Sequence, residues 1–168
     1  MKLYLLRHGI AEERDSKAYP DDAGRPLTAE GRRRTKEFGR WLRRREIRFD
    51  AIVSSELLRA RQTADIVARA LRFPDRLVRL AELAPEADAR KLVKALATRW
   101  PTAKRLLLVG HEPQLGEVVS HLCTGQPDTL QVAFKKGGLC RLDIDTFRAG
   151  RCARLDWLIA PSLMKSKR

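Results

Sequence analysis

The chain has 168 residues, of which 43% are apolar and 33% charged, and this mixture is typical of a globular protein with one core of ordinary domain size. No apolar run approaches the roughly 20 residues that a membrane span needs. The first apolar run stops at Arg7 and His8, too early for a signal peptide. We therefore expect a cytoplasmic protein that makes no use of a membrane.

The charge of the chain is strongly positive. Lys and Arg total 35 against 21 Asp and Glu, a formal net charge of +14. Such a surface attracts nucleic acids, acidic protein faces and phosphorylated ligands. Many of the arginines fall in residues 31–46, opposite a helical face marked by Thr35, Phe38, Trp41 and Leu42. No aromatic-rich recognition motif accompanies them, so a solvated helix surface is favoured over a nucleic-acid site.

The cysteines indicate neither a metal site nor a disulfide scaffold. Cys123, Cys140 and Cys152 are odd in number and well separated, with no CxxC pair and no histidine at ligand spacing. Buried or unreactive thiols are the expected outcome.

Apolar strand-like runs alternate with helix-like periods along the chain. Thr28 is placed to cap the first helix, and Pro113 opens the last one. Glycine-containing breaks in the tail indicate a hairpin and an edge strand. The expected elements are strands at 2–6, 49–55 and 104–110, helices at 27–46, 55–71, 88–99 and 113–125, a loop at 73–85, and tail strands within 130–145 and 152–160.

This order predicts an α/β fold in which a mostly parallel central sheet is covered by helices on both faces, a three-layer α/β/α arrangement. The early strands are apolar throughout rather than alternating, as strands buried on both faces are. No linker, repeat or low-complexity segment interrupts the chain, so we expect a single domain over 1–168. Its basic end, 164–168, is expected to fray.

Arginine and histidine side chains follow three of the predicted strands. Arg7 and His8 come directly after the first strand, Arg59 after the second and His111 after the third. Ligands bind beyond the carboxyl ends of the strands in open α/β sheets, so these side chains are expected to converge at one edge. His121 lies on the apolar side of a helix and is expected to be structural.

The residue types at this edge favour a phosphoryl group. Arginine offers a planar fork of donors that matches a tetrahedral phosphoryl group. Arg59, in the first turn of its helix, would lean back over the strand ends. Imidazole is one of the few side chains that takes a phosphoryl group covalently, and Gly9 lets the backbone curl beside His8.

The sequence resembles a known family, the histidine phosphatase superfamily, in the branch that contains phosphoglycerate mutases and acid phosphatases. Within it the chain is most similar to the small phosphohistidine phosphatases of the SixA type. The resemblance covers nearly the whole chain and rests on "LYLLRHGIAE", "RPLTAEG", "IVSSELLRARQTA", "LAELAP" and "LLLVGHEPQLGEVVSHL", in family order.

The resemblance implies a phosphoglycerate mutase-like fold and roles by position. His8 would be the nucleophile that forms a phosphohistidine. Arg7, Arg59 and His111 would line the phosphate pocket, and Arg25 could face its mouth. The resemblance implies no metal and no cofactor.

The chain departs from the family pattern at two places. The usual "SP" before the second arginine is Ser54–Ser55 here, a change expected to affect the helix cap more than the chemistry. Larger members carry an acid on the connection after the second helix. The candidates on this short connection are Glu82, which aligns loosely, and Glu86.

The shortness of the chain leaves little for a lid, and an open, basic pocket suits a phosphate displayed on a protein. The expected function is therefore a metal-independent phosphatase that acts through a phosphohistidine intermediate, with a phosphohistidine-bearing protein as substrate and partner. A phosphatase of small phosphoesters or phosphoramidates is the second hypothesis. A module that binds phosphoproteins or nucleic acid without turnover is a third, from a different class.

Overall fold

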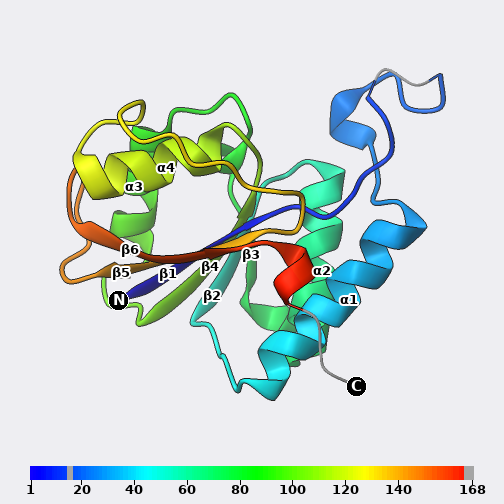
Figure 1. Ribbon diagram of the computed structural model, residues 1–168, viewed down its shortest axis with the longest axis horizontal. Helices are drawn as coiled ribbons and strands as arrows, with labels where there is room; N and C mark the ends of the chain where they lie inside the picture. The colour runs from blue at the N-terminus through cyan, green and yellow to red at the C-terminus, as the bar shows by residue number, and fades with distance from the viewer. Residues whose placement is uncertain (15–16, 165–168) are drawn as a thin grey trace.

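The computed structural model describes residues 1–14 and 17–164, and within them the strands form one mixed sheet. Figure 1 shows this sheet edge-on, with its strands in the order β3-β2-β4-β1-β5-β6. β1, β2, β3 and β4 are parallel, and β5 and β6 continue the sheet in antiparallel fashion. The strands are β1 Lys2–Arg7, β2 Ala51–Ser54, β3 Leu77–Arg79, β4 Arg105–Gly110, β5 Leu139–Ile144 and β6 Ala153–Ile159.

Helices cover both faces of the sheet, which confirms the three-layer α/β/α prediction. α1 and α2 lie on one face, and α3 and α4 on the other (Figure 1). The helices are α1 Ala29–Arg44, α2 Leu58–Leu71, α3 Ala89–Arg99 and α4 Gln114–Thr124, with short 3-10 turns η1 Asp22–Gly24, η2 Pro74–Arg76, η3 Ala81–Leu83 and η4 Pro161–Leu163. Among the described residues no helix is long and apolar enough to cross a membrane.

Side chains along β1 point alternately to the two faces of the sheet and so contribute to two separate hydrophobic cores. Leu3 and Leu5 belong to the cluster under α3 and α4. Tyr4 and Leu6 point the other way, into the cluster under α1 and α2. Both faces of the strand are buried over positions 3–6, which is why the sequence is apolar at each of these four positions.

The start of α1 is fixed against the chain that leaves β1. Thr28 caps the helix, as predicted, by accepting a hydrogen bond from the Gly31 amide at 2.9 Å, and its own amide donates to the Ile10 carbonyl at 3.0 Å. A Cβ on Gly31 would lie 2.0 Å from the Ile10 carbonyl oxygen. The "LTAEG" motif therefore lets α1 pack directly against the segment that follows His8.

Three segments differ from the sequence prediction. Leu77–Arg79, expected in a loop, forms the edge strand β3, and α2 begins at Leu58 rather than near residue 55. Residues 131–138 form no strand, so the first tail strand starts only at Leu139. Of the basic end expected to fray, 165–168 lie outside the described residues, while Met164 is buried in the core under α1 and α2.

Candidate active site

The four strand-end residues converge as expected at the carboxyl edge of the sheet. Arg7 ends β1 and His8 follows it, Arg59 lies in the first turn of α2, and His111 follows β4. The rings of His8 and His111 have centroids 5.0 Å apart, and the Nε of Arg59 lies 3.2 Å from the Nε2 of His8. The side chains of both histidines and of Arg59 are buried. Parallel β1–β4 and β2–β4 pairing sets this convergence.

The hydrogen bonds of His8 define its tautomer. Its Nδ1 lies 2.7 Å from the carbonyl oxygen of Gly9, which can only accept, so Nδ1 carries the proton. The lone pair of Nε2 then accepts from the Nε–H of Arg59. Gly9 is held in turn, because its amide donates to the hydroxyl of Thr63 at 3.1 Å. The ring nitrogen that has a lone pair is therefore Nε2, which faces the arginine.

Both histidines are neutral at ordinary pH. Burial lowers the pKa of His8 to about 3, and repulsion from a protonated His111 ring and from the charges of Arg59 and Arg7 contributes to the lowering. Burial also lowers the pKa of His111 to about 3, helped by Arg59. The His8 lone pair is consequently available without prior removal of a proton.

Ser55 orients His111. The Nε2 of His111 lies 2.9 Å from the Ser55 hydroxyl, which accepts from the Leu57 amide at 3.3 Å and has no other acceptor for its own proton among the described residues. We therefore infer that the hydroxyl donates to Nε2 and that His111 carries its proton on Nδ1, a buried atom without a partner among the described residues. The replacement of "SP" by "SS" thus affects the candidate active site as well as the start of α2. The sequence had indicated an effect mainly on the helix cap.

Arg7 supplies a second unpaired donor. Its Nη1 donates to the carbonyl of Phe134 at 2.6 Å, and the Phe134 amide donates to a carboxylate oxygen of Glu112 at 2.8 Å. The Nε of Arg7 is buried and has no partner in the described part of the chain. Arg7 Nε and His111 Nδ1 are thus two buried donors that lack an acceptor, and a phosphoryl group is an acceptor of the right charge.

Asp22 completes the network, and sequence reasoning missed it. The guanidinium of Arg59 donates to the Asp22 carbonyl at 2.7 Å and to its carboxylate at 2.9 Å. Arg25 donates to the same carboxylate at 2.8 Å and to the Glu12 carbonyl at 2.6 Å. Although burial acts to raise it, the pKa of Asp22 lies below its ordinary value because of Arg25 and Arg59. The sequence signal that could have identified Asp22 is its position three residues before Arg25, in a segment whose residues are typical of a turn.

Glu82 stands apart from these contacts. It lies on η3, directly after β3, and its carbonyl accepts from the side chain of Gln114 at 2.6 Å. Among the described residues no hydrogen bond or ion pair joins its carboxylate to His8, Arg59 or His111. Glu86 is exposed. The role of either acid as a proton donor stays a prediction.

His121 and the cysteines have structural surroundings. The Nδ1 of His121 lies 3.0 Å from the Gly125 carbonyl, and its Nε2 accepts from the Gly150 amide at 3.1 Å. The cysteines are free, and burial raises the pKa of Cys140 to about 12, which makes it unreactive. The described residues contain no group of three or more His, Cys, Asp or Glu side chains that could hold a metal ion.

The comparisons with known proteins identify the family of the chain. Residues 3–86 match the model of the histidine phosphatase superfamily (branch 1), and the chain belongs to that family. An uncharacterized protein of Picosynechococcus is 40% identical over 144 residues, which cover 84% of each chain. The phosphohistidine phosphatase SixA of Escherichia coli is 26% identical, with 98% of this chain and 97% of that protein covered.

Solved structures extend the likeness to three dimensions. A structure of the protein histidine phosphatase SixA complexed with tungstate matches with a TM-score of 0.84 at 26% identity, over 98% of this chain and all of that one. The family and these relatives support a phosphatase activity for this chain.

Proposed function

We propose that this chain is a phosphatase of protein phosphohistidine, and that His8 carries the phosphoryl group between the two halves of the reaction. The contact between Arg59 Nε and His8 Nε2 supports this most directly, because it places a neutral nucleophilic nitrogen against a guanidinium. The unpaired donors Arg7 Nε and His111 Nδ1 belong to residues at the carboxyl ends of the paired strands β1 and β4. Together they offer a phosphoryl group positive charge and directed hydrogen bonds.

In the first half of the reaction the Nε2 lone pair attacks phosphorus. The bond from phosphorus to the leaving nitrogen breaks, and the leaving group takes that electron pair. Arg7, Arg59 and the Nδ1–H of His111 hold the phosphoryl oxygens while this exchange occurs. The Nδ1–H of His8 keeps its hydrogen bond to the Gly9 carbonyl, which stabilises the positive charge that the ring acquires.

In the second half water attacks phosphorus. The bond to Nε2 breaks, its electron pair returns to the ring, and inorganic phosphate leaves after a proton passes from the water to the surrounding solvent. His8 is then restored as the neutral tautomer that the Gly9 carbonyl favours.

The substrate class follows from the leaving group. An alkoxide needs a proton from a placed acid, help worth on the order of 10²- to 10⁴-fold. Among the described residues no hydrogen bond or ion pair joins the Glu82 carboxylate to His8, Arg59 or His111, and the lowered pKa of Asp22 keeps that carboxyl ionised and without a proton to give. A phosphorylated imidazole leaves without such help once its ring is protonated. The name of the SixA relatives points to the same substrate.

We further propose that no metal takes part, because Arg7 and Arg59 already bring the positive charge that a metal would supply. EDTA should leave the rate of hydrolysis unchanged. A large loss that a divalent ion restores would contradict this part of the proposal.

The test of the substrate class is a comparison of bond types. We expect a phosphohistidine peptide to be hydrolysed with a higher kcat/KM than a phosphoserine peptide of the same sequence, and Glu82→Gln to change the former little. Glu86→Gln on the same connection is the matched control. Equal rates on the two peptides, with the phosphoserine rate collapsing in Glu82→Gln, would show a working acid and a phosphoester substrate instead.

A further inference from the structure

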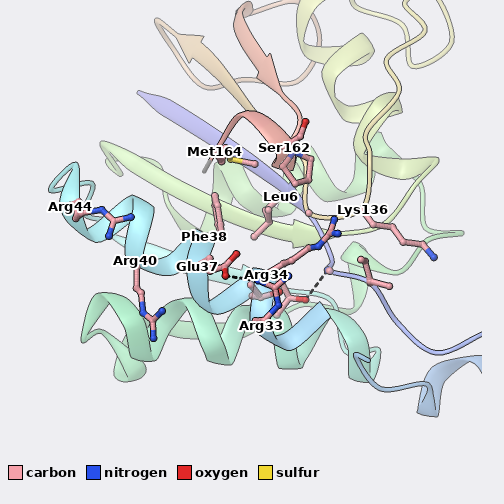
Figure 2. Close-up of a pocket in the computed structure, with 16 residues that line it drawn as sticks. Leu6, Arg33, Arg34, Glu37, Phe38, Arg40, Arg44, Lys136, Ser162 and Met164 are labelled. Carbon is pink, nitrogen blue, oxygen red and sulfur yellow. Dashed lines mark hydrogen bonds and ion pairs between the residues drawn. The ribbon is translucent and has the colours of Figure 1, made fainter. Parts of the chain in front are cut away.

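A cavity lies beside the candidate active site, between α1, the turn after β1 and η4 (Figure 2). Its volume is about 560 Å³. Apolar side chains line part of its wall: Ile10 and Pro161 are half-buried, and Leu6, Phe38 and Met164 are buried beneath them. An occupant with an apolar side chain would find apolar surface to cover here.

The rim of this cavity is basic. Figure 2 shows Arg40 and Arg44 at one end and Lys136 at the other. Arg33, also on the rim, is paired with Glu37 at 2.6 Å and with Glu30 at 2.8 Å. Within the described residues, by contrast, no ion pair neutralises Arg40 or Arg44. The rim therefore carries unbalanced positive charge, on a chain whose formal net charge is already +14.

The cavity and the candidate active site share a wall. Leu6 and Gly9, which bracket Arg7 and His8 in the chain, both line the cavity. Gly137 lines it too, and its amide lies within hydrogen-bond distance of the Arg7 carbonyl at 3.1 Å and the His8 carbonyl at 3.0 Å. A protein surface that places a phosphohistidine against His8 would thus have this cavity directly alongside.

We propose that this cavity is a docking site for an acidic segment with an apolar anchor, carried by the protein that bears the phosphohistidine. The inference rests on the proposed function and adds the surface chemistry of the substrate to it. The basic rim would pair with carboxylates, and the apolar wall would take a side chain such as leucine. A second copy of this chain, at +14, and its own Lys-Ser-Lys-Arg end carry charge of the same sign as the rim and complement it poorly.

The first experiment compares three synthetic phosphohistidine peptides with free phosphohistidine. In one the residues beyond the phosphohistidine are Glu and Leu, in the second Glu and Ser, and in the third Lys and Leu. We expect kcat/KM of the Glu-Leu peptide to exceed that of each other peptide by about tenfold, the effect of one to a few exposed charge and apolar contacts. The difference should lie in KM.

Two variants locate the effect at the cavity. Arg40→Glu/Arg44→Glu reverses charge on the rim, and Ser162→Trp, at an exposed wall position, fills the cavity without a change of charge. Each should lower kcat/KM of the Glu-Leu peptide by about tenfold and leave free phosphohistidine within about twofold. Lys91→Glu/Lys94→Glu, on exposed positions of α3 across the sheet, makes the same change of net charge and should have no such effect.

A binding measurement separates this inference from the proposed function. A fluorescein-labelled Glu-Leu peptide without phosphate should bind the wild type by fluorescence anisotropy, and bind more weakly to both cavity variants, even if no phosphohistidine is hydrolysed. If the Glu-Ser peptide bound as tightly as the Glu-Leu peptide, or if the α3 control variant lost as much binding as the cavity variants, net charge alone would explain the effect. Either result would overturn the docking site. Tighter binding of single-stranded DNA, unaffected by Ser162→Trp, would overturn it in favour of a polyanion surface.

Discussion

The hydroxyl of Ser55 lies 2.9 Å from Nε2 of His111, and this contact decides which nitrogen of His111 can donate to a ligand. Both residues are buried, so no solvent competes for the hydrogen bond. The family motif carries proline at the position of Ser55, and proline has no such hydroxyl. The orientation of His111 in this chain therefore depends on the hydroxyl of Ser55.

Ser55→Ala should allow His111 to exchange tautomers and lower kcat/KM on phosphohistidine by roughly 5- to 100-fold, the cost of leaving one buried polar atom unpaired. Ring ¹⁵N NMR should show the Nδ1–H form of His111 in the wild type and a mixture in the variant. Ser54→Ala, which removes the neighbouring buried hydroxyl, should leave the His111 signals unchanged. An unaltered tautomer and rate in Ser55→Ala would show that Ser55 only packs.

Arg59→Lys should lower the rate although it keeps the charge. The guanidinium directs three separate donors to His8 and Asp22, and an ammonium on a flexible stem cannot hold that geometry. The loss of one charge-assisted contact in the transition state is worth roughly 2–4 kcal/mol, about 30- to 1000-fold in kcat. Arg69→Lys, exposed on the same helix, is the control, and near-normal turnover of Arg59→Lys would mean that Arg59 does not touch the phosphoryl group.

Acid should destabilise the fold through its neutral histidines. The pKa values of His8 and His111 are about 3 in the folded protein, against 6.5 for an ordinary histidine. Below pH 6.5 these two histidines therefore bind protons in the unfolded chain but stay unprotonated in the native state. The free energy of unfolding should fall between pH 6.5 and 3, with a limiting slope of about 1.4 kcal/mol per pH unit for each histidine.

Urea unfolding in phosphate-free buffer from pH 7.5 to 5 measures this slope, and a His8→Gln/His111→Gln variant should show a shallower one. In ¹H NMR the two rings should not titrate between pH 8 and 5. Ordinary titration of either ring near pH 6.5 would contradict the neutral pair.

Gly31→Ala should destabilise the protein although alanine is the better helix former. A Cβ there would lie 2.0 Å from the Ile10 carbonyl oxygen. The backbone would have to move to relieve this clash, at a cost of about 1–3 kcal/mol in the free energy of unfolding. The move would also displace the turn after His8, so activity should fall. Gly24→Ala, whose nearest neighbour is Asp21 Oδ2 at 3.8 Å, is the control for stability. A more stable Gly31→Ala would disprove the close approach.

The sequence predicted those features that local pattern determines. The apolar runs of β1 and β4, the cap at Thr28 and the helical period of α2 placed Arg7, His8, Arg59 and His111 at one sheet edge, and the structure brings them together. Each of these signals lies within a short stretch of chain, and the parallel pairing of the strands brings their carboxyl ends to the same edge of the sheet.

Features that depend on distant pairs escaped prediction. Ser55 and His111 are 56 positions apart, and Asp22 and Arg59 are 37 apart, so neither pair leaves a local pattern. β3 is too short to show alternation, and its residues are only half-buried or exposed because it lies at the sheet edge. The cavity beside α1 could not be predicted either, since five separate segments line it.

The most direct test of the account is to trap the phosphoenzyme. Rapid acid-free quenching during turnover of ³²P-labelled phosphohistidine peptide should yield labelled protein that is stable in base and labile in acid, with the label on His8 by peptide mass spectrometry. His8→Ala should fold, carry no label and show no turnover. Label on a serine, or hydrolysis by folded His8→Ala at the wild-type rate, would contradict the central claim that His8 carries the phosphoryl group.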